Sequence, residues 1–227
     1  EEAVTQYRTA REEGGQGNRI LALLQRLRTI CAHPAAELRS DHETLSLREH
    51  LQLSPKLAWL VRRLEEIRAR GDKAIVFSEF RDVQRLIQRA VSEVFAIDAP
   101  IINGSTSVDA EIDHSRQRII DRFQAREGFG VLVLSTTAVG FGVNIQAANH
   151  VIHFTRPWNP AKEDQATDRA YRIGQTKDVY VYCPTVVGDG YETFEQRLDA
   201  LLGRKRSLSR DMLAGVQEIG VEEFDGI

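Results

Sequence analysis

Short apolar runs alternate with amphipathic stretches along most of the 227 residues. The apolar runs lie at residues 73–78, 99–102, 131–134, 151–154 and 179–183. Their length and composition are typical of strands that a parallel sheet buries on both faces. The stretches between them place apolar residues at helical spacing. Strands that alternate with helices predict an α/β fold, with a doubly wound, mostly parallel sheet flanked by helices.

Residue types at the ends of these stretches mark helix boundaries. Ser54 followed by Pro55 is a strong start signal, and Gly71 predicts the end of the same helix. Asp82 is predicted to cap the next helix. The helix predicted after the second strand carries the apolar residues Ile112, Ile119, Ile120 and Phe123.

Two more helical segments flank the sheet-forming part. Apolar residues at helical spacing run from Ile20 to Ile30, and Pro34 ends that pattern. The second segment follows residues 188–190 and carries Tyr191, Phe194, Leu198, Leu201 and Leu202. We therefore predict a helical segment over residues 1–53, the sheet-containing lobe over 54–187, and an amphipathic helix with an acidic tail over 188–227.

Composition and charge narrow the class of protein. The 42% apolar and 28% charged residues are ordinary for a globular protein, and no apolar run approaches the roughly 20 residues of a membrane span. The two cysteines supply neither a disulfide framework nor a zinc site, which favours the cytoplasm or nucleus. His150 and His153 fall on opposite faces of one predicted strand, and no metal ligand is predicted. With a net charge of −3, any contact with DNA must depend on local placement of donors.

Ligands of such sheets bind at the carboxyl ends of the strands, so candidate chemistry is sought in the loops that follow them. After Trp158, Asn159 and Pro160, a helix is predicted from residue 160 to about 172. Gln165, Asp168, Arg169 and Arg172 would then lie on one face of that helix. The alternative is an ordinary solvated face with ion pairs along the helix.

Glycines mark two further loops. Gly140 and Gly142 follow a predicted strand, but a third glycine and room for a helix are missing, so a dinucleotide-binding loop is disfavoured and a plain turn remains. Gly104, Ser105 and Thr106 could offer amides and hydroxyls to a phosphate group, although such triplets are common in turns.

Five short strings of residues follow one another along the chain. They are Ile-Val-Phe-Ser at 75–78 with Phe80, Asn-Gly-Ser-Thr at 103–106, residues 134–144, Trp-Asn-Pro at 158–160, and Gln-Ala-Thr-Asp-Arg-Ala-Tyr-Arg-Ile-Gly-Gln at 165–175. In this order they resemble the motifs of the second RecA-like lobe of Swi/Snf-type helicase-like ATPases, in helicase superfamily two. Residues 27–34 are similar to a helical segment that precedes that lobe, and the likeness runs from about residue 20 to 210. Val139 before Gly140, and Ala32, depart from the usual pattern.

The resemblance implies roles for individual residues. Arg169 and Arg172 match arginine fingers that face ATP held on the first lobe. Positions at the ATP site or lobe interface are matched by Gln165, Asp168, Gly140, Gly142 and Asn144. Positions on the DNA side are matched by Gly104, Ser105, Thr106, Ser135, Thr136 and Trp158, although Trp158 could equally be a buried anchor under its loop.

The resemblance also implies partners and cofactors. It predicts a duplex DNA translocase that uses ATP and Mg²⁺, located in the bacterial nucleoid or a eukaryotic nucleus, without a membrane partner. No Gly-x-x-x-x-Gly-Lys-Ser/Thr string occurs in the 227 residues, so the first RecA-like lobe is expected to hold the ATP phosphates. The alternatives are a non-catalytic scaffold or nucleic-acid-binding module and, less favoured, a Rossmann-type cofactor enzyme.

Overall fold

The computed structural model describes residues 2–12, 17–37, 45–107, 115–138, 144–172, 174–211 and 220–224. Helices and strands alternate through the central part, as the apolar pattern predicts. In chain order the elements are α1 (Glu2–Glu12), α2 (Gly17–Ala32), η1 (Pro34–Glu37), α3 (Leu47–Leu53), α4 (Pro55–Ala69), β1 (Lys73–Phe77), α5 (Arg81–Phe95), β2 (Ile101–Ile102), α6 (Arg116–Ala125), β3 (Gly130–Leu134), β4 (His150–His153), α7 (Pro160–Thr167), β5 (Tyr180–Tyr182), α8 (Phe194–Asp211) and η2 (Val221–Phe224).

The five strands form one sheet in the order β2-β3-β1-β4-β5, and every neighbouring pair is parallel. All residues of β1, β3 and β4 are buried, so the continuous apolar runs of the sequence are the interior strands. The predicted parallel α/β fold is confirmed.

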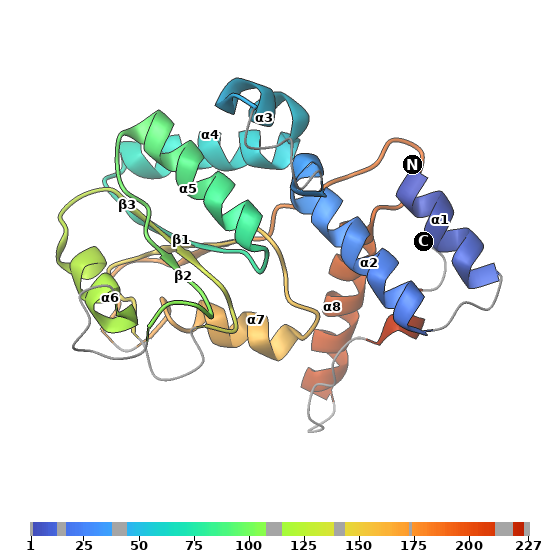
Figure 1. Cartoon of the computed structure of the whole chain (residues 1–227). Helices are drawn as coiled ribbons and strands as arrows, with labels where there is room; N and C mark the ends of the chain where they lie inside the picture. Colours follow the sequence, from blue (N-terminus) through green and yellow to red (C-terminus); the bar gives the residue numbers. More distant parts are fainter. Residues whose placement is uncertain are drawn as a thin grey trace.

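Helices cover both faces of this sheet (Figure 1). On one face, Ala74 and Val76 of β1 pack with apolar residues of α4 and α5, and residues of α3 join them. On the other face, Ile75 and Phe77 pack with residues of α6 and α7. The alternation along β1 assigns successive side chains to two different cores. His150 and His153 are both buried, on opposite faces of β4 as predicted: His150 stacks on Tyr182, and His153 on Phe77.

A third core lies beside the sheet, where Figure 1 shows α1, α2 and α8 together. Tyr7 of α1, Leu24 of α2, Leu198 of α8 and Phe224 of η2 are all buried in it. The Tyr7 hydroxyl donates to the Phe224 carbonyl at 3.1 Å. Segments far apart in the sequence thus share one apolar cluster. Among the described residues, no helix is both long and apolar enough to span a membrane.

The helix boundaries follow the predicted caps in part. The Ser54 hydroxyl accepts from the Leu57 amide at the start of α4, and Gly71 has a φ of 68° just after its end. The prediction for Asp82 is wrong. Phe80 is the N-cap of α5, without a side-chain hydrogen bond, and Asp82 lies within the first turn, where a carboxylate favours the helix dipole without capping.

Two other helix predictions need correction. Tyr191 lies before α8, because the Thr193 hydroxyl accepts from the Gln196 amide and fixes the start of that helix two residues later. The helix over residues 160–172 ends at Thr167, so Asp168, Arg169 and Arg172 are not on it. The predicted helix residue Ile112 lies outside the described residues.

Candidate nucleotide and DNA sites

The loops predicted to face DNA begin at one edge of the sheet. Phe77 of β1 is in register with Leu134 of β3 and with His153 of β4, and Ile102 of β2 is also in register with Leu134. Each of these four residues ends its strand. Because the strands are parallel and aligned, the loops after them start side by side, where ligands of such sheets bind.

The loop after β2 is a turn organised by Asn103. The amide and hydroxyl of Ser105 donate to the Asn103 side-chain oxygen at 3.0 and 2.6 Å, and the Asn103 amide donates to the Thr106 hydroxyl at 3.1 Å. Gly104 and Ser105 are exposed. A side chain added at Gly104 would meet no atom within 4 Å, so the backbone there is open to approach.

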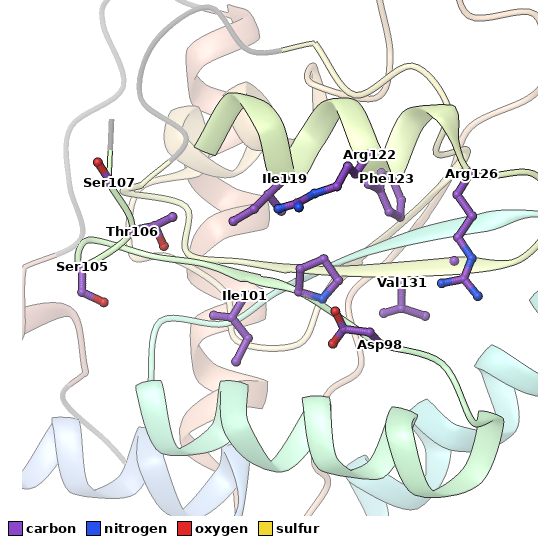
Figure 2. A pocket seen from close by; sticks show the side chains of 12 residues that line it. Asp98, Ile101, Ser105, Thr106, Ser107, Ile119, Arg122, Phe123, Arg126 and Val131 are labelled. Carbon is purple, nitrogen blue, oxygen red and sulfur yellow. The ribbon is translucent and has the colours of Figure 1, made fainter. Parts of the chain in front are cut away.

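A cavity of about 700 Å³ extends from this turn along α6 (Figure 2). Ser105 and Thr106 lie at one end and Arg126 at the other, with Arg122 between them. Hydroxyl and guanidinium groups on one surface are the donors that proteins use for a nucleic-acid backbone.

The loop after β3 is held by Glu79, which follows β1. The amide of Thr136 donates to Glu79 Oε1 at 2.8 Å, and the Thr136 hydroxyl donates to the same oxygen. The Ser135 hydroxyl lies 3.4 Å from Glu79 Oε2. Two residues predicted to contact DNA therefore direct their donors to one carboxylate.

Arg116 of α6 connects the two DNA-side loops. Its guanidinium donates to the carbonyls of Thr106 at 3.1 Å and Ala138 at 2.9 Å, and lies 3.5 Å from that of Asn103. A planar fork with several donors can hold carbonyls of two loops at once. No pattern in the sequence singled out Arg116, because its partners are backbone atoms.

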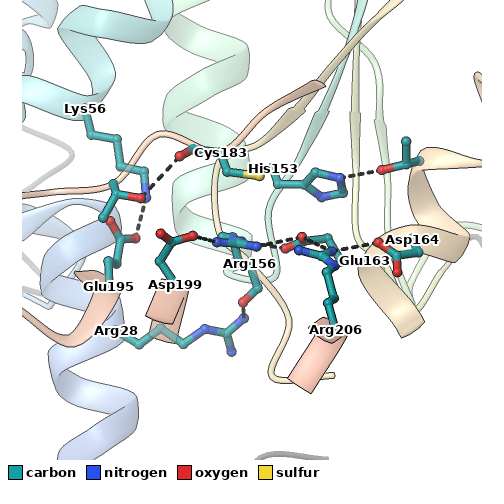
Figure 3. A network of polar contacts seen from close by, with 12 residues as sticks. Arg28, Lys56, His153, Arg156, Glu163, Asp164, Cys183, Glu195, Asp199 and Arg206 are labelled. Carbon is teal, nitrogen blue, oxygen red and sulfur yellow. Dashed lines mark hydrogen bonds and ion pairs between the residues drawn. The ribbon is translucent and has the colours of Figure 1, made fainter. Parts of the chain in front are cut away.

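A buried ionic network fixes the loop after β4 (Figure 3). Arg156 donates to both Glu163 oxygens of α7, at 2.7 and 2.9 Å, and also pairs with Asp199 of α8. Arg206 of α8 donates to Glu163 at 2.6 Å. Arg28 of α2 donates to the Arg156 carbonyl at 2.8 Å. These pairs hold the loop against α2, α7 and α8.

Trp158 of this loop packs into the third core. Its ring centroid lies 6.0 Å from that of Phe194 and 5.1 Å from that of Phe224. The next residue, Asn159, caps α7 by accepting from the Ala161 amide at 2.9 Å. Trp158 is thus an anchor of its loop, and it also lines a cavity of about 140 Å³ shared with Glu79 and Thr136.

The segment that carries the two candidate arginines leaves the helical geometry after Thr167. Arg169 and Ala170 make turn hydrogen bonds to Ala166 and Thr167, three residues earlier. The Arg169 carbonyl accepts from the Ile145 amide at 2.9 Å, a bond to another segment instead of a helical one. This bond joins the segment after α7 to the segment before β4, and the sequence pattern gave no sign of it.

Gln165, Asp168, Arg169 and Arg172 nevertheless line one cavity, of about 800 Å³. The Arg169 side chain belongs to a residue only 9% exposed. Within the described ranges, its guanidinium has no hydrogen-bond or ion-pair partner. Because this guanidinium lines an open cavity beside Arg172, its donors are accessible to an anion, and the cavity is a candidate anion site.

Arg172 is exposed and reaches a second predicted residue. Its guanidinium donates to the Asn144 side-chain oxygen at 2.6 Å. The structure thus brings Asn144 to the arginine segment. Gly140 and Gly142, also predicted for this site, lie outside the described residues.

Gln175 is a further residue of this site, and the sequence pattern indicated no role for it. Its side-chain amide donates to the carbonyls of Gln146 and Ala148, each at 2.9 Å, and lies 3.3 Å from that of Ala170. Lys177 pairs with Asp72 at 2.5 Å, directly before β1. These bonds fasten the arginine segment to residues that precede β4 and β1.

Comparison with known proteins identifies the family. The model of the helicase conserved C-terminal domain matches residues 55–174. Zorya protein ZorD of Escherichia coli O139:H28 is 54% identical over 225 residues, covering 98% of this chain and 20% of that protein. The putative ATP-dependent helicase/translocase YwqA of Bacillus subtilis is 34% identical, covering 91% of this chain and 21% of that protein. The chain spans about a fifth of the length of these curated relatives.

Solved structures show the same fold. The Sulfolobus solfataricus SWI2/SNF2 ATPase core in complex with dsDNA superposes with a TM-score of 0.71 at 34% identity, covering 92% of this chain and 41% of that one. The C-terminal domain of the Sulfolobus solfataricus ATPase gives a TM-score of 0.65 at 29% identity, covering 95% and 86%. The chain belongs to the helicase conserved C-terminal domain family and is a RecA-like C-terminal lobe of the Swi2/Snf2 type.

Proposed function

We propose that this chain is the C-terminal motor lobe of a DNA-dependent ATPase that moves along duplex DNA. In this proposal a first RecA-like lobe holds ATP and Mg²⁺, and the present lobe closes on them. The observation that carries the proposal is Arg169, a residue with a largely buried stem whose guanidinium has no partner among the described residues and lines a cavity shared with Arg172.

The donors of this cavity suit a nucleotide phosphate. Arg169 offers an unengaged guanidinium fork, and Arg172 retains further N–H donors beyond the one that binds Asn144. ATP bound by the first lobe would supply the transferred phosphoryl group. Arg169 and Arg172 would stabilise the negative charge that develops on its oxygens, while Gln165 and Asp168 would position the lobe interface.

The proposed DNA contacts lie in the loops at the carboxyl ends of the strands. Gly104, Ser105 and Thr106 lie in an open turn, and Ser135 and Thr136 lie in the neighbouring loop. Such amides and hydroxyls contact phosphates without reading base sequence. Trp158 would support this surface from its anchored position. The likeness to the Sulfolobus solfataricus ATPase core, which was solved in complex with dsDNA, supports this assignment.

The arginine assignment is tested in the full-length protein with Arg169→Ala and Arg172→Lys. DNA-stimulated ATP hydrolysis should fall by a factor on the order of 10³ for Arg169→Ala. Arg172→Lys should lose most activity, because lysine keeps the charge but loses the planar fork. ATP affinity should fall far less, since the first lobe would hold most of the nucleotide, and DNA affinity should be largely retained.

Arg85 of α5 provides the matched control. It is exposed and lies 3.7 Å from Asp82, so Arg85→Ala should leave hydrolysis unchanged. Near-full DNA-stimulated turnover in both Arg169→Ala and Arg172→Ala would contradict the assignment, and the segment would then be an ordinary charged surface.

A further inference from the structure

The Glu79 carboxylate is bound by the donors that the proposed function assigns to DNA. Thr136 directs both its amide, at 2.8 Å, and its hydroxyl to Glu79 Oε1, and the Ser135 hydroxyl lies 3.4 Å from Oε2. A carboxylate and a phosphate accept the same charge-assisted hydrogen bonds from amides and hydroxyls. The group that these donors now hold therefore has the chemistry of a backbone phosphate.

The surroundings of Glu79 also suit an anion. Arg28, Lys162 and Thr137 line the same cavity of about 140 Å³. Arg28 is buried, rests 5.1 Å from the centre of the Phe80 ring, and is held by its bond to the Arg156 carbonyl. Its position is thus fixed by the protein, and its charge persists on this side of the loop.

Glu79 is able to leave without a change of fold. Its backbone amide donates to the Thr155 hydroxyl at 2.8 Å, which fixes the main chain at this point. The side chain is only half-buried and has three rotatable bonds beyond that anchor. Rotation of the side chain alone can free the Thr136 amide and hydroxyl and the Ser135 hydroxyl.

We propose that the Glu79 carboxylate occupies a subsite for a DNA backbone phosphate and must be displaced when duplex DNA binds. The inference rests on the proposed DNA contact of Ser135 and Thr136. Glu79 then lowers DNA affinity in two ways: it competes for the donors, and its charge repels the incoming phosphate. A phosphate can reach Ser135 and Thr136 only after the Glu79 carboxylate has moved away, so Glu79 opposes DNA binding.

The variant that isolates the charge is Glu79→Gln in the full-length protein. The glutamine side-chain oxygen still accepts from Thr136, so the support of the loop is kept while the negative charge is removed. Binding to a fluorescently labelled duplex, measured by anisotropy at low salt, should become about fivefold tighter. This is the effect of removing one like charge about 4 Å from a phosphate in water-like surroundings. The gain should shrink as salt rises.

Glu79→Ala and Glu65→Gln complete the test. Glu79→Ala removes both charge and acceptor and should also tighten binding, whereas Glu65→Gln, on the exposed side of α4, should leave affinity unchanged. Unfolding temperatures establish that each variant is folded. If the wild type binds DNA but Glu79→Gln does not bind more tightly, the displacement proposal is overturned and Glu79 is only a support of the loop. If no variant binds duplex DNA, the proposed function fails, and this inference fails with it.

Discussion

Arg169 and Arg172 look equivalent in the sequence, but the structure gives them different surroundings. Arg169 is buried and has no partner in the described part of the chain, while Arg172 is exposed and bound to Asn144. The Arg169 guanidinium lines the shared cavity with its donors unengaged by the described residues, whereas part of the Arg172 fork is already bound to Asn144. Arg169 is thus the stronger candidate for contact with phosphate.

This difference predicts a loss of activity without a large change in stability. Arg169→Met should change the free energy of unfolding by less than about 1 kcal/mol, because methionine keeps an apolar chain in place of the buried arginine stem and the guanidinium has no partner among the described residues. The same change in the full-length protein should abolish DNA-stimulated hydrolysis. Arg172→Met should alter stability by less than about 0.5 kcal/mol, as an exposed substitution. Denaturant titration of the lobe measures both, and a destabilised Arg169→Met would show that Arg169 supports the fold.

His153 predicts how stability depends on pH. Burial lowers its pKa from 6.5 to about 4; the nearby Glu163 carboxylate opposes this shift and the Arg156 guanidinium adds to it. The folded state thus keeps His153 neutral where the unfolded chain takes up a proton. Stability is complete above about pH 6.5 and falls as pH drops toward 4, by about 2 kcal/mol at pH 5. The pKa of His150 is lowered mainly by burial too, so its contribution has the same sign.

Unfolding free energies at pH 7 and pH 5 measure this dependence. His153→Leu removes the titrating group and should reduce the loss of stability between the two pH values, whatever its effect at pH 7. The comparison uses the slope and not the absolute stability, because the substitution also removes the bond to the Thr167 hydroxyl. An unchanged slope in His153→Leu would assign the pH dependence to other groups.

At the scale of elements, the sequence predicts what apolar periodicity controls. The interior strands and the buried face of α4 follow from it, because burial on both faces of a sheet requires continuous apolar runs. The end of α7 does not follow from it, nor does the bond beyond that end from the Ile145 amide to the Arg169 carbonyl. Local preferences do not contain such long-range hydrogen bonds.

The candidate sites, too, have features that the sequence predicts and features that it does not. Residue types indicated which loops carry donors, and the structure places Asn144 beside Arg172. The engagement of Ser135 and Thr136 by Glu79 was not predictable, because it depends on the register of β1 and β3. Arg116 was missed for a related reason: its partners are carbonyls, which every residue type provides.

At the scale of the whole molecule, the two candidate sites are parts of one lobe that lacks a phosphate-binding loop in its 227 residues. We therefore expect the isolated chain to show no measurable ATP hydrolysis, with or without duplex DNA, because Arg169 and Arg172 would have no nucleotide held before them. A relative's C-terminal domain has been solved by itself, so the lobe is a reasonable object for this assay.

Steady-state hydrolysis by the purified chain is the measurement, with the full-length protein assayed beside it as the positive control. Robust turnover by the chain alone would contradict the division of labour between two lobes and would require a complete ATP site within these residues.

The shortness of the outer strands has a consequence for self-association. β2 has two residues and β5 three, so each border of the sheet offers few unpaired amides and carbonyls. A longer flat border would be a template on which another copy could add a strand, the usual beginning of fibrillar aggregates. This sheet presents little such template, so strand addition by another copy of the chain is hindered, and the buried apolar strands at the centre stay out of contact with neighbouring molecules.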